Sequence, residues 1–284
     1  MLKLYCWGLC SNRFIYQMFM VVLFCFIFTG CTENQYSEKQ LGEASAKMKD
    51  YYLTEMDHKT VLGIDTVRYL AERSEIQDAL AAEDESIAVD LIEETERSIR
   101  DSTKHSDFQL HAHTAQKNCM FKHWKDANDS ECFILFRHSI KYAKQENDII
   151  HGFEVGHEGL LLRAVAPVLK DDIYMGTIES LQSVASIVED LNEENEILIF
   201  FMHENRLDVA TDLKGCATCQ GLAVAQEKVD TDFFESLKSV DIHKLYTEDY
   251  LVHDGYLISG VVIVDVSGLD SGVAVLGKRL SDIR

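Results

Sequence analysis

The chain has 284 residues, which is enough for one large domain or two small ones. Hydrophobic residues make up 46% and charged residues 26%, a balance that supports a buried core and excludes a long disordered chain. Asp and Glu total 48 against 27 Lys and Arg, and the net charge of -21 disfavours nucleic acid and anionic membrane surfaces as partners.

Residues 1–30 have the pattern of an export signal. They contain no acidic residue, and Lys3 and Arg13 precede a nearly continuous apolar run from Phe14 to Phe28. The run is shorter than the ~20 residues that a helix needs to cross the hydrocarbon layer, which favours a cleaved signal over a permanent anchor. The basic residues before the run and the acidic residues after it place the rest of the chain outside the cytoplasmic membrane.

The residues that end the apolar run, Phe28-Thr29-Gly30-Cys31, resemble the lipobox of bacterial lipoproteins. The resemblance implies that Cys31 is lipidated and becomes the new N-terminus, although Phe28 departs from the usual aliphatic residue. An uncleaved anchor helix is the alternative. Both alternatives predict an extracytoplasmic protein that is held at the membrane by its N-terminus.

Residues 31–104 are predicted to form a helical stalk. Between Ser37 and Lys104 there is no proline, and apolar residues recur at helical spacing. A helix of about forty residues would be roughly 60 Å long, longer than a small domain is wide. A break near Ala82 to Asp84 would let a second helix fold back on the first.

Residues 105–194 are predicted to form a first α/β module. From Asp107 the period changes to two, because Phe108, Leu110 and Ala112 alternate with Gln109, His111 and His113, which predicts a strand with one buried face. A helix near 132–144, strands near 149–154, 160–169 and 174–180, a turn at 170–172 and a helix over 181–193 follow.

Residues 195–284 are predicted to form a second α/β module. It has a strand over 196–202, a short helix over 232–239 and a closing hairpin of 256–265 with 272–276. Both halves end in a strand pair joined by a polar turn, although they show no strong residue-by-residue identity. We therefore predict two modules with antiparallel sheets on one helical spine.

Candidate binding residues are densest between 108 and 163. His111 and His113 lie two apart on a predicted strand, as do Lys122 and Trp124, so each pair shares a face. Arg137, Glu154 and Arg163 follow within the same stretch. An aromatic ring beside basic groups suits a small solute that has an apolar body and a carboxylate.

Five short motifs resemble those of double Cache sensor domains, which occur in bacterial two-component kinases and chemoreceptors. In order, they are Lys122-His123-Trp124, Phe136-Arg137, Gly152-Phe153-Glu154-Val155-Gly156, Leu162-Arg163-Ala164-Val165-Ala166-Pro167-Val168 and Gly176-Thr177-Ile178-Glu179. The resemblance implies two PAS-like modules on a long helix, with the ligand pocket in the membrane-distal module, here 105–194, and 195–284 as the membrane-proximal module. Lys122 stands where the family mostly has arginine, and Ala164 replaces the usual glycine.

The same resemblance implies a noncatalytic sensor for a small charged organic solute, which is a carboxylate, an amino acid or an amine. The expected ligand-binding residues are His111, His113, Lys122, Trp124, Arg137, Glu154, Arg163 and Glu179. Glu154 and Glu179 either contact the solute or hold the basic residues in place. Since the chain ends at Arg284 without a cytoplasmic output domain, we expect it to signal through a partner protein.

Metal and cofactor signals are weak in this sequence. An i, i+2 histidine pair such as His111 and His113 can bind a metal, but the spacing identifies no third ligand. The sequence also has no H-E-x-x-H, no G-x-S-x-G and no phosphate-binding glycine loop. We therefore predict no metal, no cofactor and no enzyme activity.

The cysteines allow a different function. Cys216-Ala217-Thr218-Cys219 is a C-x-x-C motif, and Cys119 and Cys132 lie upstream. In an oxidising compartment we expect the disulfides Cys216–Cys219 and Cys119–Cys132. The alternative function is a thiol-disulfide oxidoreductase that works through Cys216 and Cys219.

Overall fold

The computed structural model describes residues 36–116, 119–122 and 137–283, with 119–122 described as backbone only. The predictions for residues 1–30, Cys31, Trp124 and Cys132 lie outside these residues. Within the described part of the chain, the residues from Gln40 onward pack as one compact unit. None of the helices in the described ranges is both long enough and apolar enough to cross a membrane.

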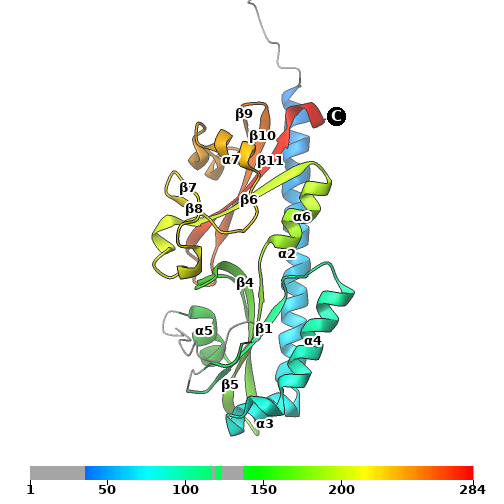
Figure 1. Ribbon diagram of the computed structural model, residues 1–284, viewed down its shortest axis with the longest axis vertical. Coiled ribbons are helices and arrows are strands. Elements are labelled where there is room, and N and C mark those ends of the chain that lie inside the picture. The colour runs from blue at the N-terminus through cyan, green and yellow to red at the C-terminus, as the bar shows by residue number, and fades with distance from the viewer. Residues whose placement is uncertain (1–35, 117–118, 123–136, 284) are drawn as a thin grey trace, which may run out of the picture. The chain divides into compact units, whose positions relative to one another are not determined.

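The helical region has one long helix and two shorter ones, α2 (Glu38–Ala71), α3 (Ser74–Ala82) and α4 (Val89–Ser102), with a 3-10 turn η1 (Glu85–Ile87) before α4 (Figure 1). The predicted break at 82–84 is confirmed, since Glu83 after α3 adopts a left-handed conformation with φ 53°. A second break, at 72–73, was not predicted. There the N–H of Arg73 bonds to the carbonyl of Leu70 at 3.0 Å and ends α2.

The first sheet has five antiparallel strands in the order β2-β1-β5-β4-β3. They are β1 (Gln109–Thr114), β2 (Cys119–Lys122), β3 (Ile150–Gly156), β4 (Gly159–Lys170) and β5 (Ile173–Gln182), with helix α5 (His138–Glu146) before β3. The predicted turn between β4 and β5 is confirmed. Asp171 and Asp172 both have positive φ there, at 50° and 61°, as short polar residues tolerate in turns.

The second sheet has six antiparallel strands in the order β7-β8-β6-β11-β10-β9. They are β6 (Glu196–His203), β7 (Thr218–Cys219), β8 (Leu222–Val224), β9 (Leu251–His253), β10 (Tyr256–Val264) and β11 (Asp270–Arg279). Two helices accompany this sheet, α6 (Ala185–Glu193) and α7 (Thr231–Leu237). Its connections contain the 3-10 turns η3 (Glu204–Arg206), η4 (Thr211–Leu213), η5 (Ile242–Tyr246) and η6 (Leu280–Asp282). Strands β7, β8 and β9 were not predicted, because two or three residues are too few to show a period.

The central strands β1, β5 and β4 of the first sheet are largely buried on both faces. Leu110, Ala112 and Ile178 pack against Val67 and Leu70 of α2 on one face, and α5 covers the other. The prediction that β1 buries only one face is wrong. His111 and His113, on the face under α5, are 5% and 2% exposed.

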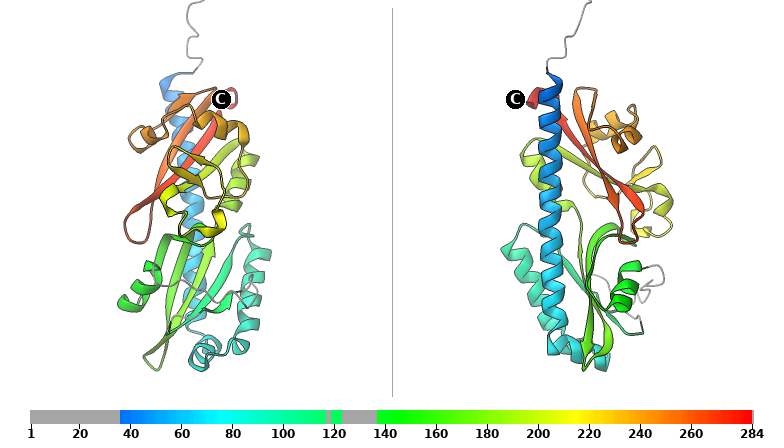
Figure 2. Two further views of the ribbon diagram at one scale, coloured as in Figure 1. Left: turned by 60° about the vertical axis from the view of Figure 1, so that its left-hand side comes forward. Right: turned by 180° about the vertical axis from the view of Figure 1, so that it is seen from behind.

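Helix α2 runs past both sheets (Figure 2). Beside the second sheet, the Ser45 hydroxyl donates to the carbonyl oxygen of Asp249 at 3.1 Å and accepts from the Ser259 hydroxyl at 2.8 Å. The predicted fold class, a long N-terminal helix with antiparallel sheets, is confirmed. The division into 31–104, 105–194 and 195–284 stays a prediction.

Candidate functional site

The strand register brings most of the predicted binding residues onto one face of the first sheet. His111 of β1 and Val165 of β4 both lie opposite Glu179 of β5, and directly opposed residues project from the same face. We call six residues of this face and of the segment entering α5 the polar cluster: His111, His113, Arg137, Glu154, Arg163 and Glu179. The backbone of Lys122 lies opposite His111. The Lys122 side chain and the whole of Trp124 are not among the parts of the chain that the structure describes.

Glu179 is the centre of the polar cluster and is fully buried. Its Oε1 lies 3.2 Å from His111 Nδ1 and 2.8 Å from His113 Nε2. Its Oε2 accepts from an Arg137 terminal nitrogen at 2.5 Å and from Arg163 at 3.3 Å. One carboxylate therefore ties together four side chains that are far apart in the sequence.

Glu154 is the second carboxylate of the polar cluster. It accepts from Arg137 Nε at 2.6 Å, and from the backbone N–H of Ser139 at 3.0 Å and its hydroxyl at 2.5 Å. Ser139 is in the first turn of α5, so Glu154 neutralises Arg137 and also caps a helix N-terminus. Sequence reasoning missed Ser139, because a contact across 15 positions leaves no local signal.

The electrostatics of the polar cluster keep its carboxylates ionised. Burial alone would raise the pKa of Glu179, but the charges of Arg137 and Arg163 outweigh it and hold the pKa well below the usual range. The pKa of Glu154 is lowered by the same two charges against the same effect of burial. Burial lowers the pKa of His111 to about 4, so this ring is neutral at pH 7.

Arg163 uses few of its donors within the described residues. It is 4% exposed, its one side-chain bond there is the 3.3 Å contact with Glu179, and its Nε is buried without a partner. Burial, followed by repulsion from Arg137, lowers its pKa. Gly156 allows the Arg163 guanidinium to approach its backbone closely, since a Cβ at that position would lie 2.5 Å from a terminal nitrogen of Arg163. A guanidinium with unspent donors is suited to an incoming anion.

Three members of the polar cluster also have metal-ligand chemistry. The ligand atoms of His111, His113 and Glu179 lie within 4.8 Å of one another, so the structure supplies the third ligand that sequence spacing did not. However, Arg137 and Arg163 are bonded to the same carboxylate. Each would repel a cation about 4 Å away by ~4 kcal/mol per unit charge at an effective dielectric constant near 20. This repulsion opposes the attraction of a cation to Glu179, so the three ligand atoms alone do not make a metal site.

The C-x-x-C cysteines correct a sequence prediction. Cys216 and Cys219 are both free thiols, so the expected disulfide between them is not formed in this structure. Pairing of β7 with β8 turns Cys219 into the core, where its thiol lies 3.8 Å from the carbonyl oxygen of Leu237, while Cys216 precedes the strand and is half-buried. Burial raises the pKa of both thiols. The pairing of Cys119 with Cys132 lies outside the described side chains.

Comparison with known proteins identifies the family. The model of the double sensory domain of two-component sensor kinases, a double Cache domain, matches residues 48–283. The chain belongs to the double Cache sensory domain family. Double Cache domains of this kind are noncatalytic, extracytoplasmic sensory domains. No curated protein matches the chain.

Solved structures similar to this double Cache chain are sensor domains. The ligand-binding domain of the Campylobacter jejuni chemoreceptor Tlp3, in complex with L-valine, is 11% identical with a TM-score of 0.47, covering 87% of this chain and 95% of that one. The sensor domain of the V. cholerae histidine kinase DctB is 11% identical with a TM-score of 0.48, covering 84% and 96%. The ligand-binding domain of the Pseudomonas fluorescens chemoreceptor CtaA, in complex with L-serine, is 11% identical with a TM-score of 0.44, covering 85% and 96%.

Proposed function

We propose that the chain is a noncatalytic extracytoplasmic sensor that binds a small charged organic solute at the polar cluster. The binding module is 105–194, the membrane-distal one. The N-terminus anchors the protein through a lipid on Cys31 or through an uncleaved helix. The occupied state is passed to a partner protein in the membrane or at its surface.

The observation that carries this proposal is Arg163, which is buried on a polar sheet face and, among the residues that the structure describes, uses few of its donors. A buried polar group without a partner costs about 1–3 kcal/mol, and more when it is charged. A solute carboxylate that accepts from Arg163 removes this cost and gains a charge-assisted bond. We therefore favour a carboxylate or an amino acid over a simple amine.

The remaining predicted residues have supporting roles in this proposal. Lys122, whose backbone faces His111, adds a second positive charge for the anionic group, and Trp124 covers the apolar part of the solute. Glu154 and Glu179 hold the guanidinium of Arg137, which leaves Arg163 and Lys122 for the solute. His111 and His113 set the position of Glu179 through its Oε1.

A route from the polar cluster to α2 exists along β5. Gln182 lies three residues beyond Glu179, and its side-chain amide donates to the backbone carbonyl of Lys59 in α2 at 2.8 Å. Close to it, a Cβ on Gly63 of α2 would lie 2.8 Å from the Ser180 hydroxyl. A solute that shifts β5 would therefore move its contact with α2, provided that the solute favours one arrangement over the other.

Calorimetric titration of the detergent-solubilised full chain with small carboxylates, amino acids and amines tests the proposal. We expect a carboxylate-bearing solute to give a saturable isotherm, and Arg163→Gln to weaken its binding by about tenfold or more. Arg97→Gln is the matched control, because Arg97 is exposed on α4. Circular dichroism establishes that each variant is folded. An absence of binding across the whole panel, with no change in melting temperature, contradicts the proposal.

The alternative is a thiol-disulfide oxidoreductase that uses Cys216 and Cys219. The raised pKa of both thiols opposes it, because the thiolate is the nucleophile in disulfide exchange. A measured reduction potential in the range of exchange enzymes, lost in Cys216→Ser, would favour this alternative.

A further inference from the structure

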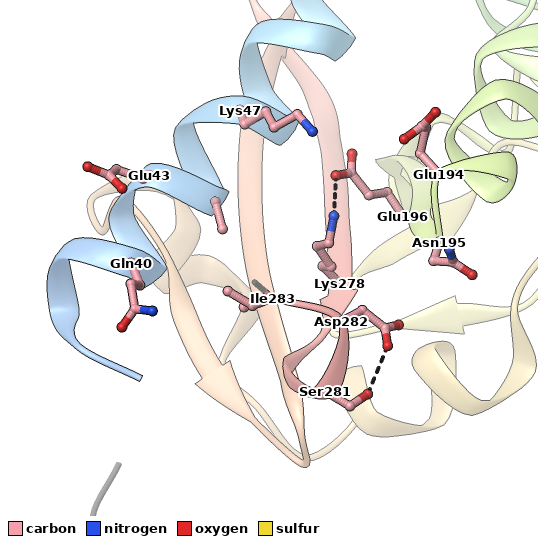
Figure 3. Close-up of a pocket in the computed structure, with 11 residues that line it drawn as sticks. Gln40, Glu43, Lys47, Glu194, Asn195, Glu196, Lys278, Ser281, Asp282 and Ile283 are labelled. Atoms are coloured by element: carbon pink, nitrogen blue, oxygen red, sulfur yellow. Dashed lines mark hydrogen bonds and ion pairs between the residues drawn. The ribbon is translucent and has the colours of Figure 1, made fainter. Parts of the chain in front are cut away.

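A groove lies between α2 and the second sheet, away from the polar cluster (Figure 3). Its volume is about 610 Å³, within the range of small-molecule sites. Three segments form it: the N-terminal part of α2, the turn from α6 into β6, and the chain after β11. The charged lining residues are Glu43, Lys47, Glu194, Glu196, Lys278 and Asp282.

The floor of the groove is a satisfied ion pair. Lys278 of β11 lies opposite Glu196 of β6 in the strand register, and its ammonium donates to the Glu196 carboxylate at 2.8 Å. The two side chains are 14% and 5% exposed. Because the pair is largely buried and held by the sheet, it gives the groove a fixed base.

The walls carry charges that are not satisfied in this way. Within the described residues, neither Lys47 on α2 nor Glu194 on the opposite wall has an ion-pair partner, and both are exposed. Figure 3 shows Lys47 extending from α2 toward Glu196, so two ammonium groups flank that carboxylate. Within the described residues, the Asp282 carboxylate has one hydrogen-bond donor, the Ser281 hydroxyl, at 3.0 Å. The groove therefore offers a cationic side and separate anionic groups.

We propose that this groove is a second binding site and that it takes a small zwitterion, an α-amino acid. The solute carboxylate binds Lys47 and the free donors of Lys278, and the ammonium group binds Glu194. An ion with a single charge would be repelled by the groove side chains that carry the same charge. A zwitterion instead pairs its carboxylate with the lysines and its ammonium group with Glu194. Because the groove opens to solvent, the side chain of the amino acid is not selected.

The groove shares no residue with the proposed sensor site. A bound amino acid would link the N-terminal part of α2 to the turn between α6 and β6 and to the end of β11. The same helix meets β5 at Gly63, which lies against Ser180, the residue after Glu179. The groove is therefore placed to bias the same helix as the polar cluster, from its other end.

The test uses L-alanine and two analogues that each lack one charge. Propionate lacks the ammonium group, and ethylamine lacks the carboxylate. Calorimetry on the detergent-solubilised full chain carrying Arg163→Gln, which weakens the proposed sensor site, should give saturable low-millimolar binding of L-alanine, and binding of either analogue should be weaker by about tenfold or more. In NMR titrations of the same sample, the side-chain amide of Asn195, which lines the groove, should shift with L-alanine.

Variants separate this site from the polar cluster. Lys47→Met and Glu194→Gln should each weaken L-alanine binding at the groove by about tenfold. The matched controls Lys214→Met and Glu227→Gln, at exposed positions away from the groove, should not change it. Arg163→Gln should also leave it unchanged, so failure of the sensor proposal is distinguishable. Equal affinity for the three compounds, no shift of Asn195, or full binding in both groove variants overturns the inference.

Discussion

The two sheets share one strand framework but differ in the side chains that fill one face. Both contain the same order, β2-β1-β5-β4-β3 in the first and β8-β6-β11-β10-β9 in the second, with β7 added at its edge. Gly176 of β5 and Gly272 of β11 mark matching positions. Their φ angles are 152° and 159°, and at each a Cβ would overlap a carbonyl oxygen of the neighbouring strand. The neighbouring pairs also have register shifts at matching places, after Val168 and after Ile263.

Aligning the two glycines shows what differs. The positions of His111, His113, Arg163 and Glu179 in the first sheet are taken by Ile199, Phe201, Ile258 and Val275 in the second. All four apolar side chains are fully buried in the core under α7. The helix that covers this face comes from matching segments, α5 between β2 and β3 and α7 between β8 and β9.

The comparison separates folding from binding. The second sheet closes this face with apolar side chains alone, so the framework does not require charges there. Replacing a buried ionic group by apolar residues of similar volume is often neutral or stabilising. The first sheet therefore carries the polar cluster at a cost in stability, which supports a binding role for it.

The largest expected effect comes from removing the central charge. Glu179→Ala leaves Arg137 and Arg163 buried without their shared partner, and we expect a loss of about 3–5 kcal/mol in the free energy of unfolding. Val275→Ala, at the matching position, removes only apolar contacts and should cost about 2 kcal/mol. Urea denaturation measures both. A loss for Glu179→Ala no larger than for Val275→Ala would mean that the cluster is not held by its ion pairs.

A smaller effect should appear as a pH dependence that arises in the first sheet. The pKa of His111 is lowered by burial to about 4, against about 6.5 in an unfolded chain. Because the unfolded state binds the proton more readily, stability is full above pH 6.5 and falls as the pH drops toward 4, by about 3 kcal/mol in all. Unfolding curves between pH 7 and 5 measure this contribution together with that of His105, whose pKa is also lowered by burial, whereas Glu179 begins to contribute only below its ordinary pKa near 4.5.

The variant His111→Asn tests the assignment of this pH dependence. It keeps a donor for Glu179 and removes the titrating ring, so the slope between pH 6.5 and 5 should flatten. His243→Asn, on an exposed 3-10 turn of the second module, should leave the slope as it is. An unchanged slope in His111→Asn would show that this histidine is not held neutral by burial.

The smallest effect is one that the two sheets should share. Gly176→Ala and Gly272→Ala each put a Cβ where φ is positive and a neighbouring carbonyl oxygen stands, so each should cost about 2 kcal/mol. Gly42→Ala is the control, because nothing lies within 4 Å of its Cβ, and alanine favours a helix by about 0.5–1 kcal/mol. Thermal unfolding measures both losses of stability. Clearly unequal losses would contradict the structural equivalence of the two glycine positions.

Much of the framework could be predicted from the sequence. Alternation of apolar and polar residues predicted β1 and the long strands, and Asp171-Asp172 predicted the turn between β4 and β5. The six members of the polar cluster came from the dense stretch 108–163 and from the motifs that resemble those of double Cache domains, and their binding role stays a prediction. Side chains two apart on a strand share a face, and short turns fix the register of neighbouring strands, so local patterns were sufficient for this much.

The pairings within the cluster were decided only by the tertiary structure. No spacing in the chain indicates that Glu179 bonds both histidines, that Ser139 bonds Glu154, or that Cys216 and Cys219 stay apart as thiols. The equivalence of Glu179 and Val275 was also invisible, because the two sheets share backbone geometry and not residue identity. Periodicity reports on which face a side chain occupies, whereas ion pairs and grooves depend on distances between segments that only packing brings together.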